Sequence, residues 1–267
     1  MSRAARLPSW AVGTLGALAL VALWWVAALT VFSDVGPGAA QAIPTPLQVA
    51  QQWADDGWAL YAKNFAVTLA EAGQGFVWGN LLAIVLSALV LVVPRLEGAV
   101  TQLAIITYCV PIVAIGPLVL IVIGAPEPGQ PSGTAIFLAA LSCFFTSVVG
   151  CLLGLKAADR AALDLVAVYG GGRFAQLRKV RLVAALPNIV SALQIAVPAA
   201  FLGAILGEYV GKVDVGLGPA MVNAQQSLIA ARVWGLALAS GAVALLGYGF
   251  FGLVRRAVTP WSRGVPA

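Results

Sequence analysis

Few residues in this sequence are of the types that carry out chemistry. The chain of 267 residues contains no histidine, which removes the commonest general base and metal ligand. Cys109, Cys143 and Cys151 lie in apolar runs without the spacing of a zinc or redox motif, and we interpret them as small buried hydrophobic residues. The neighbouring carboxylates Asp55 and Asp56 are assigned to a loop. The sequence therefore predicts no catalytic centre, metal site or cofactor.

A phosphate-binding loop for nucleotides is also missing from the sequence. Such a loop needs the pattern G-x-x-x-x-G-K-[ST]. The nearest segment begins at Gly207, has too few residues before its next glycine, and carries Val213 in place of the hydroxyl residue. We therefore do not expect an ATPase site in this chain.

The segment from Lys156 to Pro187 has the most informative pattern of charged residues and glycines. Asp159 can cap a helix that continues to Tyr169. Three consecutive glycines, beginning at Gly170, should end that helix. A second, basic helix is expected over Arg173–Leu182. The pattern predicts two short helices at a sharp bend, which either rest on anionic lipid headgroups or dock a partner protein.

Composition places this loop in a membrane protein. Hydrophobic residues make up 61% of the chain and charged residues 9%, whereas soluble domains carry about 25% charged residues. A chain this apolar cannot cover itself with polar surface in water, so lipid must be its solvent. We expect an all-α membrane protein with a single membrane domain.

The apolar segments predict about six transmembrane helices, because a bilayer core of about 30 Å is crossed by about 20 apolar residues in a helix. The first could alternatively be a cleavable signal peptide, but it is longer than the usual apolar run of about 7–15 residues. The proline-rich and charged stretches between the segments are assigned to loops. The predicted spans are Ala11–Phe32, Gly75–Val93, Leu103–Ile123, Thr134–Leu155, Ile189–Val210 and Val233–Val254.

The basic residues predict the orientation of these spans. If the N-terminus is cytoplasmic and the spans alternate, only Lys63, Lys212 and Arg232 of the 15 basic residues fall outside. We therefore expect a multi-pass protein of a bacterial inner membrane with both termini cytoplasmic. Its parts would be an N-terminal segment 1–10, a transmembrane domain 11–255 with the cytoplasmic loop 156–187, and a tail 256–267.

The loop resembles the EAA loop of ABC-transporter permeases. That family pattern is Glu-Ala-Ala, three residues, Gly, nine residues, then Ile-x-Leu-Pro. Here Gly170 and the pair Val180 and Leu182 fall at the right distances, and a later Ala-Ala-Leu-Pro ends at Pro187. Asp164 replaces the glutamate with a shorter acidic side chain, Leu165 and Val166 replace the alanines, and Val183 replaces the first proline.

Three further stretches resemble the nitrate, sulfonate and taurine branch of these permeases. Ile43–Pro46 is similar to the branch's Leu-Pro-x-Pro sequence, and Val110–Leu118 to its third-span signature, which thiamine-precursor permeases share. Gly207-Glu208-Tyr209 stands where the branch has Ala-Glu followed by an aromatic residue or Met. The resemblance covers most of the chain.

The resemblance implies a type I ABC importer permease with MetI-like architecture. Two copies, or one copy and a close relative, would pair with two ATPase subunits, and a periplasmic or lipid-anchored binding protein would deliver the solute. A sulfonate, taurine, nitrate or a thiamine pyrimidine precursor remains open as the solute, and no nucleic acid is implied. The loop would couple the permease to the ATPase through Asp164, Ala167, Gly170, Arg173, Val180, Leu182 and Pro187.

The fifth predicted span has features of helix packing or of a solute path. Gly203, Gly207 and Gly211 recur every four residues, which is typical of close helix contact in lipid. Pro198 should kink this span, and Glu208 either lines the path or reaches water and headgroups. In the third span, Pro111 and Pro117 should free backbone groups that need burial or water, so both spans are expected beside the path.

Two other function classes are weighed against a permease. A membrane-embedded enzyme would need clusters of His, Asp or Arg at the membrane interface, and the sequence does not contain them. An ion-coupled secondary transporter is the stronger alternative, but it favours several ionisable residues at mid-membrane, and none is found there.

Overall fold

The computed structural model describes residues 8–33, 35–36, 41–127 and 129–261. Most of the predicted N-terminal segment, residues 1–7, and the end of the predicted tail, residues 262–267, lie outside this part. The described residues form helices and no strand, as the composition predicts. In chain order the elements are α1 (Ser9–Leu29), α2 (Pro46–Val92), η1 (Pro94–Leu96), α3 (Glu97–Cys109), α4 (Ile112–Ile123), α5 (Gly133–Lys156), α6 (Arg160–Val168), α7 (Arg173–Gln176), the π-helical turn η2 (Leu177–Arg181), α8 (Leu182–Val210), α9 (Leu217–Gln226) and α10 (Ala230–Val258).

Five of the described helices are long and apolar enough to cross a membrane, and the bent pair of η1–α3 and α4 raises the number to six. These numbers agree with the all-α class and the roughly six spans expected from composition. Helices α1, α5 and α10 coincide with predicted spans to within about four residues at each end.

Helix α2 begins far earlier than the predicted second span. It starts at Pro46, whose missing N–H is harmless at the first position of a helix, and it continues through Asp55 and Asp56. The prediction of a loop there was therefore wrong. The helix kinks at Gly57, whose φ of 69° lies in the left-handed region. The polar residues had indicated a loop, but an acidic side chain can lie within a helix when it has hydrogen-bond or ion-pair partners.

The predicted third span is not one straight helix. α3 ends at Cys109 and α4 begins at Ile112, and the two helices meet at 97°. Pro111 lies in the break as the N-cap of α4. Proline has no N–H to continue the preceding helix and disfavours helical geometry in the residue before it. The chain therefore turns sharply where the sequence pattern predicted a distorted span.

Helix α8 also begins earlier than the predicted fifth span. It starts at Leu182 directly after η2 and continues through Pro187 and Pro198. Pro187, expected to stand before the span, is thus inside the helix. Helices in apolar surroundings tolerate an internal proline when neighbouring groups satisfy the freed carbonyl.

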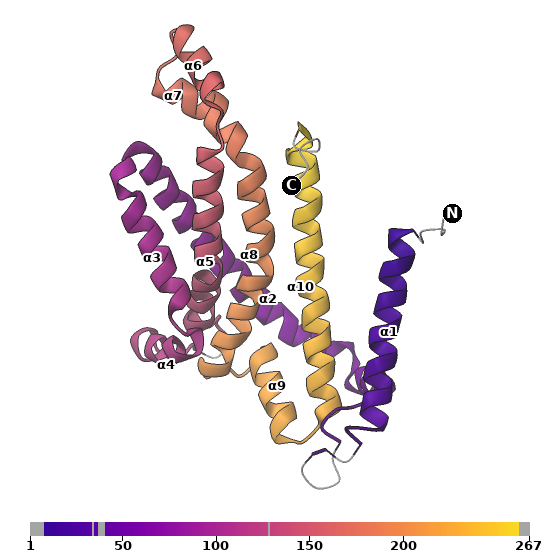
Figure 1. The fold of residues 1–267 in the computed structure, drawn as a ribbon. Coiled ribbons are helices and arrows are strands. Elements are labelled where there is room, and N and C mark those ends of the chain that lie inside the picture. The colour runs from indigo at the N-terminus through magenta and orange to yellow at the C-terminus, as the bar shows by residue number, and fades with distance from the viewer. Residues whose placement is uncertain (1–7, 34, 37–40, 128, 262–267) are drawn as a thin grey trace, which may run out of the picture. The chain divides into compact units, whose positions relative to one another are not determined.

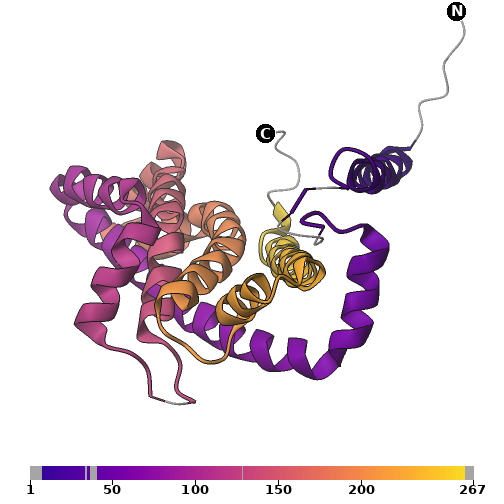
Figure 2. The ribbon, with the colours of Figure 1, turned by 90° about the horizontal axis from the view of Figure 1, so that it is seen from below.

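The described chain forms two compact units, which we treat separately. The first comprises Met1–Ala62 and Ala220–Ala239, and the second Lys63–Pro219 and Ser240–Ala267. In the second unit, α5 packs along α8 on one side and against α3 on the other (Figure 2). The loop helices α6 and α7 lie at one end of the α5–α8 pair, which we name the loop end (Figure 1). The opposite end, where α5 begins and α8 ends, is named the far end.

The apolar core of the second unit lies where α2, α3 and α5 meet. Ala83 and Ala104 are fully buried there and allow the helices to approach, while Phe144 fills the space between them. The cluster consists of Ala83, Val90, Val100, Ala104, Phe144, Val148 and Leu152.

A buried ion pair stabilises the first unit. Asp56 accepts hydrogen bonds from Arg232 Nε at 2.8 Å and from Gln52 Nε2 at 2.6 Å. The Asp56 side chain is fully buried, so removing Arg232 would leave a carboxylate without its counter-charge. Trp24 and Trp234 stack in the same unit with ring centroids 5.4 Å apart.

A cluster of polar groups joins four elements at the far end of the second unit. Glu208 of α8 accepts hydrogen bonds from Thr68 Oγ1 of α2 at 2.5 Å and from the backbone N–H of Gly218, at the start of α9, at 2.6 Å. Glu71 of α2 accepts from the N–H of Ser132, before α5, at 2.6 Å. Each carboxyl group thus meets a free N–H near a helix N-terminus, where negative charge is favoured.

The same cluster orders the turn between α8 and α9. Leu217 N donates to Thr68 Oγ1 and Gly216 N donates to Asn64 Oδ1, both at 3.0 Å. We name Asn64, Thr68, Glu71 and Glu208 the far-end cluster.

We predict that Glu208→Ala lowers the apparent melting temperature of the purified chain in detergent. The substitution leaves the buried Gly218 N–H without its acceptor, whereas the Thr68 hydroxyl keeps the Asn64 carbonyl at 3.2 Å. An unpaired buried donor lowers the free energy of unfolding by about 1–3 kcal/mol, which corresponds to a decrease of roughly 2–12 °C in melting temperature. Thr68→Val, which keeps the shape and removes the hydroxyl, should act in the same direction. Asp214→Ala, which removes an exposed carboxylate nearby, is the control. Equal melting temperatures for Glu208→Ala and the control would show that the cluster does not stabilise the fold.

Candidate functional site

The loop between α5 and α8 begins with a short helix, α6, and a sharp bend, as predicted. The predicted second short helix over Arg173–Leu182 is not separate, because α7 and η2 continue directly into α8. Asp159 caps α6 by accepting a hydrogen bond from Ala161 N at 3.3 Å. Helix α6 ends at Val168, and Gly170 follows with a φ of 79°, which L side chains rarely adopt. These observations confirm the predicted cap and the glycine turn.

Helix α6 is tied to α7, and through it to α8. Gln176 Nε2 of α7 donates to the carbonyl of Leu163 in α6 at 3.0 Å. Gly171 lies so close to Val166 that an added Cβ would come within 2.5 Å of the valine side chain. From α7 the chain passes through η2 into α8 without a loop. One hydrogen bond and a continuous run of helical backbone therefore connect α6 to the start of α8.

The tip of this loop presents charged and apolar side chains together. Asp164, Ala167 and Gly170 are exposed, and Leu182 is exposed at the start of α8. Val180 and Pro187 are half-buried. Arg173 opens α7, and its side chain lies outside the described part. Large apolar residues, Val168, Tyr169 and Phe174, are also exposed, at 83%, 84% and 75%. A surface with these features suits a protein partner.

The glycine repeat of α8 faces α5 of the same chain. An added Cβ on Gly203 would come within 2.6 Å of the Leu138 carbonyl oxygen, and one on Gly207 would collide with the Ala135 backbone. Gly211 caps the helix end beside Ser132. Two of these glycines therefore allow backbone contact between α5 and α8, as small residues do in membrane proteins.

The remaining residues expected beside a path lie apart from one another. Glu208 is only 2% exposed and belongs to the far-end cluster, so in this conformation it does not reach water. Pro198 is half-buried in α8. Pro111 and Pro117, before and within α4, are exposed.

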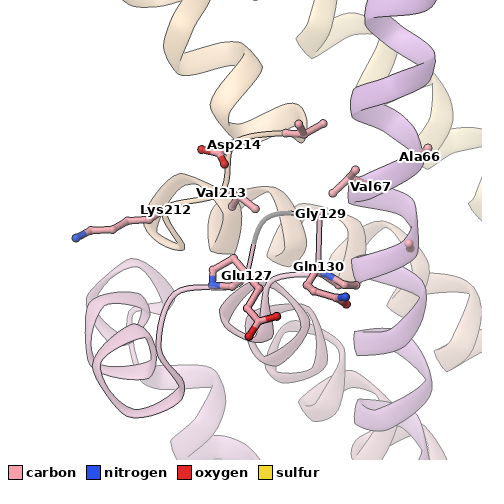
Figure 3. Close-up of a pocket in the computed structure, with 12 residues that line it drawn as sticks. Ala66, Val67, Glu127, Gly129, Gln130, Lys212, Val213 and Asp214 are labelled. Atoms are coloured by element: carbon pink, nitrogen blue, oxygen red, sulfur yellow. The ribbon is translucent and has the colours of Figure 1, made fainter.

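A pocket of about 290 Å³ opens at the far end, and its lining contains none of the residues predicted to lie beside the path (Figure 3). Its wall combines the apolar Ala66 and Val67 of α2 with the charged side chains of Glu127, Lys212 and Asp214 from two loops. The described residues contain no group of side chains that could hold a metal ion. The pocket therefore has mixed charge and no metal-binding character.

Sequence reasoning missed Asn64, Thr68 and Glu71. Their spacing of four and three residues places them on one helix face, which was a usable signal. The signal was overlooked because this stretch was assigned to a loop before the second span. The pairing of Asp56 with Arg232 was missed for the same reason.

Comparison with known proteins adds to this geometry. Residues 79–261, more than half of the chain, match the family described as binding-protein-dependent transport system inner membrane component. A probable ABC transporter permease protein of Haemophilus influenzae is 32% identical over 68% of this chain and 71% of its own length.

Two other relatives carry names that include a solute. The formylaminopyrimidine transport permease protein ThiX of Halalkalibacterium halodurans is 27% identical over 77% of both chains. The putative aliphatic sulfonates transport permease protein SsuC of Bacillus subtilis is 25% identical over 94% of this chain and 88% of its own length.

A solved structure of the MetNI methionine ABC transporter in inward-facing conformations contains a chain of the same fold. The TM-score is 0.58 at 21% identity, with 76% of this chain and 97% of the other covered. This likeness supports the architecture expected from the loop sequence. The family match and the Haemophilus relative identify the chain itself. This chain belongs to the family of binding-protein-dependent transport system inner membrane components and is a permease subunit of an ABC importer.

Proposed function

We propose that this permease docks an ATPase subunit through α6 and imports a small uncharged nitrogen heterocycle related to the thiamine pyrimidine precursor. The proposed docking rests on the exposed loop tip. The Gln176–Leu163 hydrogen bond ties this tip to α7, which leads into α8. The site would comprise Asp164, Ala167, Gly170, Arg173, Val180, Leu182 and Pro187.

Docking at α6 gives the ATPase a mechanical connection to the membrane helices. The apolar residues Val168, Tyr169 and Phe174 would enter a groove on the partner, and the exposed carboxylate of Asp164 would select its charge pattern. Movement of the partner would then reach α8 through α7 and η2. ATP hydrolysis belongs to that separate subunit in this proposal.

The distribution of charge supports a cytoplasmic loop end. The basic residues of η1, the end of α5, the loop and the end of α10 gather there: Arg95, Lys156, Arg160, Arg178, Lys179, Arg181, Arg255 and Arg256. Lys63 and Lys212 are the basic residues of the second unit's far end, beside Glu127 and Asp214. By the positive-inside rule the loop end faces the cytoplasm, and the far end would face the external binding protein.

A solute path would run beside α8 and α4, in a pair of permeases made of two copies or of one copy and a close relative. Pro111, Pro117, Pro198, Gly203, Gly207, Glu208 and Gly211 are proposed to shape it or to pack the helices that do. Glu208 acts here by holding the far end of α8 against α2 and α9.

The choice of solute rests on charge and on the ThiX relative. The central parts of the helices, residues 64–92, 97–123, 133–155, 182–210 and 233–254, contain no lysine or arginine. A path without cations is poorly suited to gripping a sulfonate or nitrate, since anions are held by charge-assisted hydrogen bonds. An uncharged pyrimidine needs only neutral donors and acceptors.

We expect Asp164→Lys to weaken binding of the ATPase subunit and to abolish ATP-driven uptake, while the permease still inserts in the membrane. The side chain is exposed, so folding should be unaffected. Co-purification with the tagged ATPase measures the effect. Asp214→Lys makes the same charge change at the far end and should leave co-purification intact. Equal recovery of ATPase with both variants would refute docking at α6.

The orientation can be tested by labelling with a membrane-impermeant maleimide in a cysteine-free background. Lys212→Cys, exposed at the far end, should react in intact spheroplasts, whereas Val168→Cys at the loop tip should react only after lysis. The reverse labelling pattern would show that the loop end faces outward, contrary to the proposed orientation.

Uptake by cells that carry the complete transporter distinguishes the solutes. Radiolabelled formylaminopyrimidine should accumulate in an ATP-dependent way, and an alkanesulfonate should neither accumulate nor compete, because the path has no cation for it. Sulfonate uptake without pyrimidine uptake would contradict the proposed solute and would leave the docking proposal unaffected.

A further inference from the structure

A second cavity opens at the loop end, and its lining includes Phe174 and Gln176 of α7, which the docking proposal also uses. Its volume is about 570 Å³, within the usual range of ligand pockets of about 300–1,000 Å³. The ends of α2 and α5, the start of α3, and α7 with η2 form its walls. We name it the loop-end cavity.

The floor of the loop-end cavity is apolar and comes from membrane-spanning helices. Val90 and Leu91 of α2 and Leu152 and Leu155 of α5 are among the lining residues. Both helices pass the length and composition test for crossing a membrane. The apolar lining is therefore contributed by the ends of two helices that are long and apolar enough to span a membrane, and it suits an acyl chain.

The rim of the loop-end cavity is cationic. Lys156 and Glu97 form an ion pair and cancel each other's charge. Arg181, the last residue of η2, lines the same rim and forms no ion pair with any residue that the structure describes. The lining of the cavity thus has a net charge of about one positive unit. Arg95 of η1 is exposed next to Pro94, which lines the rim.

A guanidinium group suits a phosphate ligand in this setting. Arginine presents planar donors that bind phosphate oxygens in pairs. Basic pockets between membrane helices at the cytoplasmic side recognise anionic headgroups. A zwitterionic lipid carries its own cationic group, so its contact with Arg181 would contribute less binding free energy.

We propose that the loop-end cavity binds one anionic phospholipid, with its phosphate at Arg181 and an acyl chain between α2 and α5. The lipid would fill the space beside α7 and η2. The site is independent of the transported solute.

Native mass spectrometry of the full chain in a mild detergent tests this site with two probes, dioleoylphosphatidylglycerol and dioleoylphosphatidylcholine. The wild type should retain one phosphatidylglycerol in preference to phosphatidylcholine. Arg181→Gln should lower phosphatidylglycerol retention about fivefold, because one basic residue near an anionic surface contributes about 1 kcal/mol. Leu91→Trp, which fills the floor, should lower retention of both lipids. Arg160→Gln, at the exposed start of α6 outside the cavity, is the matched control and should behave as the wild type.

Several results would overturn the proposal. Equal phosphatidylglycerol retention by Arg181→Gln and the wild type would remove Arg181 from the site. Competition by sn-glycerol 3-phosphate, which has the anionic group without acyl chains, would indicate a site for free phosphate esters. Displacement of the lipid when the ATPase subunit is added would mean that a segment of that protein occupies the cavity.

Discussion

The hydrogen bonds that Glu208 accepts from Thr68 and Gly218 set the arrangement of the far end. A buried carboxyl group without donors is costly, and a mostly apolar chain offers few of them. The donors here come from the face of α2 and the first turn of α9, so both elements must approach the end of α8. Glu71 draws the start of α5 to the same place. The turns of the far end are thus defined by polar contacts within an otherwise apolar unit.

At the loop end, residues close together in the sequence determine the shape of the loop. The Asp159 cap and the left-handed Gly170 define a short helix and its turn, and Gln176 ties that helix to α7. The loop therefore has a defined shape without a large core of its own. A surface presented in this way can bind a partner without first being ordered, which lowers the entropic cost of association.

The sequence predicted what depends on local chemistry or on average polarity, and missed what depends on contacts between distant residues. The fold class, the cap at Asp159 and the turn at Gly170 follow from composition and residue type. The start of α2 does not, because Asp56 is stabilised in the helix by Arg232, far away in sequence. The 97° turn at Pro111 was expected only as a distortion, since proline predicts a break without its angle. Asn64, Thr68 and Glu71 were missed because their part of α2 was assigned to a loop, and their partner Glu208 lies far away in sequence on α8.

The contact of Gly203 and Gly207 with α5 has a mechanical consequence. If α8 rotated or slid by one residue, a side chain would enter the space of a missing Cβ and strike the α5 backbone. Steric contact therefore opposes sliding of the two helices past each other and favours movement of the pair as a single lever. With 29 residues in α8 and a rise of about 1.5 Å per residue, this lever is about 40 Å long. If the loop docks the ATPase as proposed, a small tilt imposed there would become a displacement of several ångströms beside the far-end pocket.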